Sequence, residues 1–151
     1  IEKIVRITSD CPLIDPTLVD KCISISENYE YVSNNTPPAI SDYANGSDVE
    51  VFSKALLYSS SKNFLDKKDM EHVTFPFWDG RMNINKFRLT KKLSDKDIRI
   101  TLDYEEDLIV LRDLLSHSKD IYINYSDIIN KYRLLELGKI NGRFQYDAGW
   151  K

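Results

Sequence analysis

The sequence predicts an α/β fold with a mainly parallel sheet. Short segments rich in Val, Ile, Tyr and Phe alternate with longer segments whose apolar residues recur at helical spacing. Strands that alternate with helices in this way usually form a parallel sheet. The length of 151 residues corresponds to about one domain, and 42% hydrophobic with 30% charged residues is ordinary for a globular protein.

The first predicted element is a strand over residues 4–8, followed by a turn and a helix. Its apolar and β-branched composition is typical of an interior strand that is covered on both faces. Asp15 suits the N-cap of the helix and Pro16 its first position, and the helix should run to about residue 28. Asp10 falls just beyond the strand, where open α/β sheets bind their ligands.

The middle of the chain is predicted to alternate between short strands and helices. The expected order is a strand over 29–33, a loop over 34–48, a strand over 49–52, helices over 53–63 and 66–73, and a strand over 84–89. Asp66 is a candidate cap for the second of these helices. The loop is rich in Asn, Pro, Ser and Gly and has few apolar anchors beyond Ile40 and Tyr43, so we expect it to be mobile.

The C-terminal third is predicted to contain one strand and two helices. Residues 98–102 are apolar and β-branched, which favours a strand. Residues 105–116 have an acidic first turn and leucines on one face, which indicates a helix. A last helix is expected over 126–137, ended by Gly138. We divide the single domain into a core, 1–118, and a C-terminal helix and tail, 119–151.

A six-residue pattern occurs twice, at residues 5–10 and 98–103, as an apolar residue, Arg, Ile, Thr, any residue and Asp. If both copies are strands, Asp10 and Asp103 offer two carboxylates to one cleft, which suits Mg²⁺ because this ion takes few protein carboxylates. Alternatively, each Asp caps a turn or helix. Arg6 and Arg99 could hold a phosphate or a substrate carboxylate, or could neutralise the two aspartates.

Three further side chains are candidates for substrate contacts. Asp48 and Glu50 share one face of a predicted strand directly after the long loop, although a solvated strand edge would look the same. His72 suits a sugar or phosphate contact, and the alternative is a structural His at a helix end.

Composition excludes several classes of function. A net charge of −3 gives no general attraction to nucleic acid. No apolar run approaches the length of a membrane span and no signal peptide opens the chain, so we expect a cytoplasmic setting. Cys11 and Cys22 lack a metal-ligand pattern and are expected to be small buried residues. The sequence contains no Walker loop, no Gly-x-Ser-x-Gly elbow and no His-Glu-x-x-His motif.

Five segments, in order, resemble the spore-coat-polysaccharide type of cytidylyltransferase, related to the synthetases of CMP-activated octulosonic and sialic acids. Residues 6–16 resemble the motif Arg-x-Thr-Gly-Asp-Cys-Pro-Leu-Ile-Asp-Pro, and 99–108 resemble Arg-x-Thr-Val-Asp-x-Pro-Glu-Asp-Leu. The other matching segments are 31–34, 46–52 and 71–74. The chain departs from the family pattern at Ser9 in place of Gly, Met70 in place of Arg and Glu105 in place of Pro.

The resemblance implies a three-layer α/β nucleotidyltransferase sandwich around a mixed, mostly parallel sheet. The implied reaction transfers CMP from CTP to a sugar, expected to be acidic, and releases pyrophosphate for surface polysaccharide or glycan biosynthesis. The implied cofactor is Mg²⁺, held by Asp10 and Asp103. Arg6 and Arg99 would assist catalysis, and the substrate contacts would be Asn34, Asp48, Glu50 and His72.

The same resemblance implies that a segment is missing. The chain starts at Ile1, directly before the first predicted strand, and the family's glycine-containing nucleotide loop would precede it. We therefore expect this chain to be the C-terminal part of the enzyme, with N-terminal strands missing, inactive alone, and forming a homodimer or pairing with the missing segment. The alternative is a non-catalytic domain that keeps the fold for assembly or sugar binding.

Overall fold

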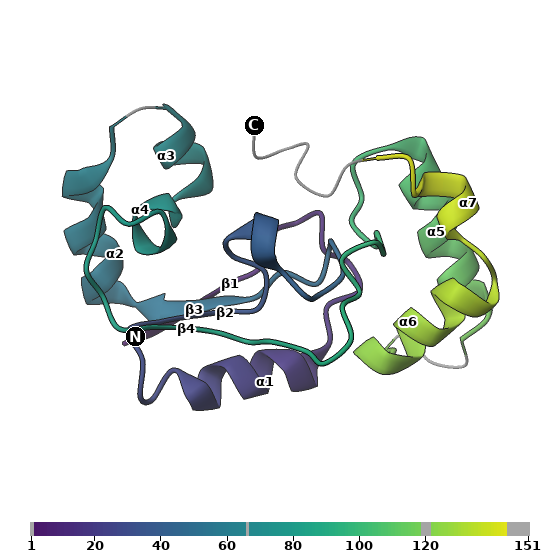
Figure 1. Ribbon diagram of the computed structural model, residues 1–151, viewed down its shortest axis with the longest axis horizontal. Coiled ribbons are helices and arrows are strands. Elements are labelled where there is room, and N and C mark those ends of the chain that lie inside the picture. Colours follow the sequence, from purple (N-terminus) through teal and green to yellow (C-terminus); the bar gives the residue numbers. More distant parts are fainter. Residues whose placement is uncertain (1, 66, 119–121, 145–151) are drawn as a thin grey trace.

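The structure is a computed structural model that describes residues 2–65, 67–118 and 122–144, and it contains a four-stranded mixed sheet with helices around it (Figure 1). The strands are β1 (Lys3–Arg6), β2 (Tyr31–Ser33), β3 (Glu50–Ser53) and β4 (Lys86–Arg88). The α-helices are α1 (Pro16–Ile25), α2 (Lys54–Ser60), α3 (Lys67–His72), α4 (Phe75–Trp78), α5 (Glu105–Ser116), α6 (Tyr125–Leu134) and α7 (Gly138–Asn141). Short 3-10 helices, η1 (Pro38–Ile40) and η2 (Ser61–Asn63), complete the list. No helix in the described ranges is long and apolar enough to cross a membrane.

The prediction of a mostly parallel sheet is wrong for the described strands. Their order is β1-β3-β2-β4, and β3 pairs antiparallel with both β1 and β2, whereas β2 and β4 are parallel. The reason lies in the connections. Residues 34–49 join β2 to its neighbour β3 without a crossover α-helix, so the chain returns in the opposite direction. The helices α2 to α4 lie between β2 and β4 and allow the parallel pairing.

The first strand is not an interior strand of this sheet. β1 forms one edge of the described sheet, and Val5 and Ile7 are 38% and 40% exposed. In the described residues β1 therefore has an open edge and a partly exposed face, and its coverage by a segment outside this chain stays a prediction.

Residues 98–102 do not form a strand, which corrects a second prediction. They make one isolated parallel bridge, in which Asn45 N donates to Ile98 O at 3.0 Å and Ile100 N donates to Asn45 O at 2.8 Å. The pairing stops at Gly46, whose φ of +96° turns the loop away. A Cβ at Gly46 would lie 2.3 Å from Thr101 N, so only glycine allows the two backbones to approach so closely.

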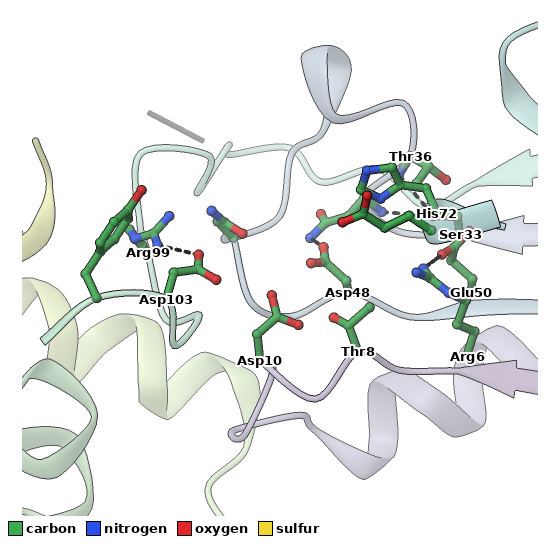
Figure 2. A pocket seen from close by; sticks show the side chains of 14 residues that line it. Arg6, Thr8, Asp10, Ser33, Thr36, Asp48, Glu50, His72, Arg99 and Asp103 are labelled. Carbon is green, nitrogen blue, oxygen red and sulfur yellow. Dashed lines mark hydrogen bonds and ion pairs between the residues drawn. The ribbon is translucent and has the colours of Figure 1, made fainter. Parts of the chain in front are cut away.

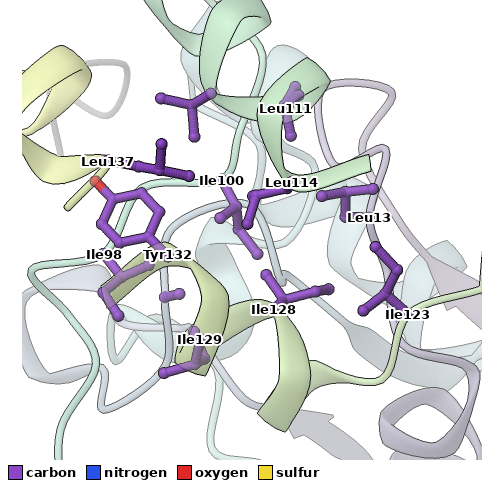
Figure 3. Packing of buried hydrophobic residues seen from close by; sticks show 12 residues of the cluster. Leu13, Ile98, Ile100, Leu111, Leu114, Ile123, Ile128, Ile129, Tyr132 and Leu137 are labelled. Carbon is purple, nitrogen blue, oxygen red and sulfur yellow. The ribbon is translucent and has the colours of Figure 1, made fainter. Parts of the chain in front are cut away.

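The described residues form three hydrophobic clusters, and one of them packs α2 and α4 against the sheet through Leu56, Phe77 and Phe52. The larger cluster fills the space between α5, α6 and residues 98–100, and its centre includes Ile100, Leu114 and Ile128, all fully buried (Figure 3). The second packs α1 against one face of the sheet through Leu18 and Cys22. Segments far apart in sequence are therefore held together on either side of the strand ends.

The helix predictions had mixed outcomes. The bounds of α5 and the N-cap Asp15 are confirmed, and Asp15 Oδ1 accepts a hydrogen bond from Thr17 N at 2.7 Å. Gly138 does not end the last long helix. Instead α6 stops at Leu134, Glu136 turns the chain with a φ of 53°, and Gly138 begins α7. The short helix α4 was not predicted, and the candidate cap Asp66 lies outside the described residues.

The long loop is well anchored, contrary to the reason given for its mobility. The Asn34 side chain is fully buried, donating to Ser47 O at 2.7 Å and accepting from Val49 N at 2.8 Å. Of the two expected anchors, Ile40 is 56% exposed, whereas Tyr43 is buried in the second cluster. Buried amide side chains therefore hold the loop together with Tyr43.

Candidate active site

A pocket of about 430 Å³ opens where the ends of the strands meet the loop and residues 99–104 (Figure 2). It is lined by Arg6, Thr8, Asp10, Ser33, Asn35, Thr36, Asn45, Asp48, Glu50, Glu71, His72, Arg99, Asp103 and Tyr104. Thirteen of these fourteen side chains carry a charge, a hydroxyl, an amide or an imidazole at physiological pH, and the remaining Tyr104 carries a phenol. This lining suits a polar, hydrogen-bonding ligand.

The structure brings together all but one of the residues singled out from the sequence. Arg6, Asp10, Asp48, Glu50, His72, Arg99 and Asp103 line the same pocket. Asn34 does not, because its side chain is buried behind the pocket wall in the loop contacts described above. Its neighbour Asn35 lines the pocket instead.

Asp10 is positioned by a turn that docks onto the second copy of the repeated pattern. Cys11 N donates to Thr8 O at 3.1 Å and closes the turn. Thr101 Oγ1 then donates to Asp10 Oδ2 at 3.0 Å, and Leu102 N donates to the backbone oxygen of Asp10 at 2.9 Å. The two segments of the repeated pattern are therefore in direct contact at their acidic ends.

Asp103 is held from behind by Arg99, whose Nη2 donates to Asp103 Oδ2 at 2.6 Å. The Asp103 side chain is 47% exposed and faces the pocket, whereas the Arg99 side chain is 5% exposed. In Figure 2 the carboxylates of Asp103 and Asp10 point into the same space. The buried Arg99 therefore fixes the orientation of the Asp103 carboxylate, which remains accessible to a ligand in the pocket.

The helix-capping role considered for Asp103 belongs to Asp107. Asp107 Oδ2 accepts from the backbone N of both Asp103 and Tyr104 at 3.0 Å, which satisfies free amides at the start of α5. It also accepts from Arg99 Nε and Nη2, each at 2.8 Å, and from Asn141 Nδ2 at 2.9 Å. Burial by itself would raise the pKa of Asp107, but these hydrogen bonds outweigh it and lower that pKa.

Arg6 and Glu50 form an ion pair on the other wall of the pocket. Glu50 is 2% exposed, pairs with Arg6 and also accepts a hydrogen bond from the Tyr31 hydroxyl. Burial, together with the Glu50 charge, raises the pKa of Tyr31 well above its usual range, so the phenol stays a donor. Thr36 Oγ1 lies 2.5 Å from the same phenolic oxygen.

Asp48 lies between these two walls and is held by the loop. Asn35 Nδ2 donates to Asp48 Oδ1, and the Ser41 hydroxyl donates to Asn35 Oδ1, so the amide orientation is fixed. Burial raises the pKa of Asp48 to about 6, and the charges of Glu50 and Asp10 add to this while the Asn35 hydrogen bond opposes it.

Both cysteines are free and buried, as predicted. Burial and the charge of Asp48 raise the pKa of the Cys11 thiol far above its usual range. Cys11 is therefore not a nucleophile of this site, although its sulfur lies 3.7 Å from Asp48 Oδ2.

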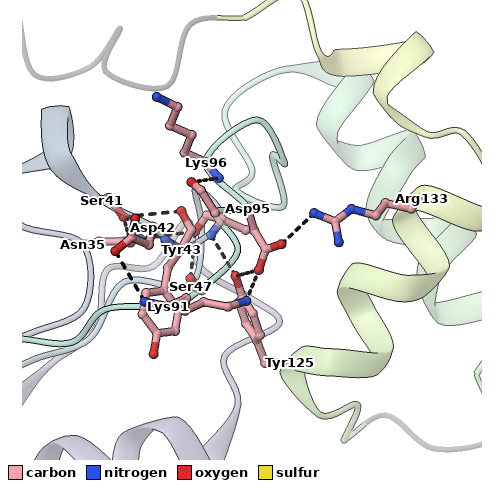
Figure 4. Close-up of polar contacts among 12 residues, drawn as sticks. Asn35, Ser41, Asp42, Tyr43, Ser47, Lys91, Asp95, Lys96, Tyr125 and Arg133 are labelled. Carbon is pink, nitrogen blue, oxygen red and sulfur yellow. Dashed lines mark hydrogen bonds and ion pairs between the residues drawn. The ribbon is translucent and has the colours of Figure 1, made fainter.

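A network outside the pocket fixes the loop against α6 (Figure 4). The Tyr125 hydroxyl accepts from Ala44 N at 3.0 Å and donates to Asp95 Oδ2 at 3.0 Å. Asp95, 2% exposed, also binds Arg133 Nη2 at 2.7 Å and the ammonium of Lys91. These contacts hold the loop that carries Asn35 and Asp48 in position relative to Arg99 and Asp103.

The sequence did not single out the other seven lining residues: Thr8, Ser33, Asn35, Thr36, Asn45, Glu71 and Tyr104. Each lies within one of the five matching segments or no more than two residues from one, so proximity in sequence was the available signal. Tyr104 could not have been identified further, because its ring stacks on Phe144 from the far end of the chain, with centroids 4.1 Å apart.

The donor set fits a hard divalent cation. Within the described ranges no group of three or more His, Cys, Asp and Glu side chains is gathered as a closed metal site. Mg²⁺ does not require one, because it usually takes one or two carboxylates and completes its shell with water and substrate oxygens. Asp10 and Asp103, which line one pocket, would provide such a pair of oxygen ligands.

Comparison with known proteins gives a match in structure. No family model matches the sequence, and no curated protein matches it. A solved structure of a cytidylyltransferase from Leptospira borgpetersenii serovar Hardjo-bovis (strain JB197) superposes with a TM-score of 0.85 and 26% sequence identity. The match covers 93% of this chain but 60% of that one. Over nearly all of its length, the chain thus has a mixed α/β fold that matches a cytidylyltransferase.

Proposed function

We propose that this chain is part of a sugar cytidylyltransferase, which transfers CMP from CTP to a sugar hydroxyl and releases pyrophosphate for surface polysaccharide or glycan biosynthesis. The observation that carries the proposal is the meeting of Asp10 and Asp103 on one polar pocket, within a fold that matches a cytidylyltransferase. The activity is proposed for the full-length protein, because the chain spans only 60% of the structure it matches.

The residues of the pocket have distinct roles in this reaction. The sugar hydroxyl attacks the α-phosphorus of CTP, the bond from that phosphorus to the bridging oxygen of pyrophosphate breaks, and the hydroxyl proton is lost. Asp10 and Asp103 would hold Mg²⁺, which supplies positive charge to the phosphates. Thr101 and Arg99 orient these two carboxylates through the contacts at 3.0 Å and 2.6 Å. Asp48 offers an oxygen that accepts a hydrogen bond from the sugar.

The two arginines of the pocket form ion pairs with protein carboxylates, which leaves them less able to bind a triphosphate. Arg6 is paired with Glu50, and Arg99 is paired with both Asp107 and Asp103. Positive charge for the phosphates must therefore come largely from Mg²⁺ or from other parts of the protein. We expect Mg²⁺ to strengthen CTP binding.

One argument for the non-catalytic alternative is that Ser9 and Met70 differ from the Gly and Arg of the family pattern. Both are exposed, Met70 at 70%, and neither lines the pocket. Neither side chain contributes to the lining of the pocket, so these two departures do not decide between the alternative and the enzyme.

The test is Asp103→Asn in the full-length protein, measured by CTP- and Mg²⁺-dependent pyrophosphate release with a panel of sugars. The substitution keeps the shape of the side chain but removes an anionic ligand, so we expect at least a hundredfold loss of turnover with little change in melting temperature. Asp113→Asn, on α5 outside the pocket, is the matched control. Absence of Mg²⁺-dependent CTP binding by the unmodified protein would favour the non-catalytic alternative.

A further inference from the structure

His72 reaches the pocket from the end of a short helix. It is the last residue of α3, and α4 begins three residues later, at Phe75. In Figure 2 His72 lies above in the view, whereas Thr8 and Asp10, on the same pocket, lie below. The position of the His72 ring in the pocket therefore depends on how α3 is held relative to the sheet.

The helix α4 is anchored to the sheet and gives α3 a fixed base. Phe77 of α4 is fully buried, and its ring meets those of Tyr31 and Phe52 edge-on, with centroids 5.3 Å and 5.2 Å apart. Phe77 N also donates to Thr74 O at 3.0 Å, at the start of the helix. In Figure 1 α4 lies between α3 and the strands. Contacts between α3 and the α4 segment therefore position α3 on the sheet.

An ion pair joins the first turn of α3 to the residues that follow α4. Asp69 is 2% exposed, and Arg81 Nη1 and Nη2 donate to its two carboxylate oxygens at 2.6 Å and 2.5 Å. Arg81 Nε donates to Asp79 Oδ2 at 2.6 Å, which orients the guanidinium. A two-pronged pair of this kind has one favourable geometry, and removing one partner of a buried pair is costly. The pair therefore fixes α3 against the end of α4.

The turn between the two helices has a strained backbone. Val73 has a φ of 58°, which is rare for a β-branched residue. Such a conformation persists only where the surrounding contacts enforce it. Here Val73 N donates to Asp69 O at 2.8 Å, and Thr74 N donates to His72 O at 2.5 Å. The His72 ring packs on Phe75, with centroids 4.6 Å apart. If α3 were released, the turn could relax and His72 would move with it.

We propose that Arg81 is a positioning residue of the sugar site: by holding Asp69 it keeps α3 in place, and it thereby keeps His72 in the pocket, in contact with the sugar. This inference rests on the proposed function, because it assumes that the pocket holds the sugar. Arg81 does not line the pocket, and its contact with Asp69 lies at the opposite end of α3 from His72. Its loss should therefore weaken sugar binding without removing any group from the lining.

Hydrogen exchange and NMR of the full-length protein test the structural part of the proposal. In Arg81→Met we expect the Val73 amide to exchange at least tenfold faster and the nuclear Overhauser effect between the His72 and Phe75 rings to weaken. Core amides such as Val51, on β3, should keep their exchange rates. Arg112→Met, at an exposed site on α5, is the matched control and should change none of these signals.

A second variant covers the case in which Arg81→Met does not fold. Arg81→Lys keeps the positive charge but loses the two-pronged contact with Asp69, so it should give a smaller increase in the exchange rate of the Val73 amide. Unchanged exchange at Val73 and an unchanged ring contact in the folded variant would overturn the proposal, whatever the activity.

A double-mutant cycle tests whether Arg81 acts through His72. With a sugar that the protein turns over, Arg81→Met should raise the KM for the sugar at least fivefold and leave the KM for CTP within twofold. In a His72→Ala background the same substitution should have no further effect, because the contact that it serves is already lost. An equal effect in both backgrounds would mean a general structural role and would overturn the proposal.

Failure of this proposal can be distinguished from failure of the proposed function. Turnover with an unchanged KM for the sugar in Arg81→Met leaves the cytidylyltransferase standing and overturns the role of Arg81. Faster exchange at Val73 and a weakened ring contact, in a protein that turns over none of the sugars tested, remove the proposed function. That result still supports the positioning of His72 by Arg81.

Discussion

The two copies of the Arg-Ile-Thr pattern have similar sequences and different surroundings. In the first, Arg6 ends an edge strand, its side chain is 20% exposed, and the neighbouring Ile7 is 40% exposed. In the second, the Arg99 side chain is 5% exposed and its neighbour Ile100 is fully buried in the larger hydrophobic cluster. Each arginine pairs with a buried carboxylate, so both copies contain a buried ion pair. The hydrophobic packing next to the ion pair differs between the two copies.

This difference indicates that the two walls of the pocket, one around Arg99 and one around Arg6, are held in place to different degrees. The wall around Arg99 is held by Asp107, by Asn141 and by the start of α5, so Asp103 has a fixed position. The wall around Arg6 is built on a strand edge, and its fixed element is Glu50 on β3. We therefore expect substitutions in the second copy to cost more stability than matched substitutions in the first.

The largest effect is expected for Asp107→Asn. It leaves the buried Arg99 guanidinium with Asp103 as its remaining carboxylate, and breaking a buried pair costs up to about 3–5 kcal/mol. The measurement is the free energy of unfolding by urea at pH 7. Asp113→Asn, on the same helix, should change it by less than about 0.5 kcal/mol. A similarly small change in Asp107→Asn would mean that the Arg99 wall is not held by this charge.

The same residue predicts a dependence on pH. The pKa of Asp107 is lowered in the folded protein, so its contribution to stability is fully present above the usual carboxyl pKa of about 3.9 and is lost as the pH falls through the lower, folded value. The unmodified protein should therefore lose stability steeply in acid, and Asp107→Asn should lose it less steeply. Parallel acid-unfolding curves for the two proteins would contradict this.

A smaller loss, about 2–3 kcal/mol, is expected for Glu50→Gln on the first wall. The amide still accepts from Tyr31 but no longer matches the charge of Arg6, which solvent can partly screen because its side chain is 20% exposed. The comparison with Asp107→Asn under the same conditions is the informative measurement. A loss larger than that of Asp107→Asn would reverse the proposed ranking of the two walls.

Asp48→Asn is expected to stabilise the protein at neutral pH. Because the folded pKa of Asp48 is about 6, the folded state keeps a proton that the unfolded state loses between about pH 4 and 6, and stability falls as the pH rises through this range. The variant removes this cost, and we expect a gain of about 3 kcal/mol at pH 8 and much less at pH 4. The unfolding free energy is measured at both pH values without Mg²⁺ and nucleotide. A gain that is equal at the two values would exclude the carboxylate charge as its cause.

The smallest effect concerns the apolar neighbours of the two arginines. Ile100→Val removes a methyl group from a fully buried site and should cost about 1 kcal/mol. Ile7→Val removes the same group from a side chain that is 40% exposed and should cost almost nothing. Equal losses in thermal or urea unfolding would show that β1 is covered in solution.

Local features were predictable from the sequence to the extent that local physics determines them. The bounds of α5 follow from an acidic first turn and the spacing of its leucines, and Asp15 caps α1 as its position before Pro16 predicts. The direction of the strands was not predictable, because it depends on whether a connection crosses over or returns. For the same reason 98–102 appeared to be a strand, although Gly46 limits its pairing to one bridge.

The pocket was predictable where a pattern repeats and unpredictable where distant segments meet. The repeat pointed to Asp10 and Asp103, which do line one pocket. Nothing local distinguishes Asn35 from Asn34, and both are buried. The Asn34 amide binds the loop backbone, whereas the Asn35 amide binds Asp48 and lines the pocket. The role of Asp107 depends on Asn141, a residue near the other end of the chain that no local pattern connects to it.

Tyr125 has a consequence for how the chain unfolds. Its ring packs against the cluster of α5 and α6 and against the cluster of α1, and its hydroxyl bridges the loop and Asp95. Because the two clusters share the Tyr125 side chain, unfolding of one removes packing contacts from the other. We therefore expect the two clusters to unfold as a single cooperative unit. The backbone amides of α1 and α5, which belong to different cores, should therefore exchange with deuterium at closely similar opening free energies.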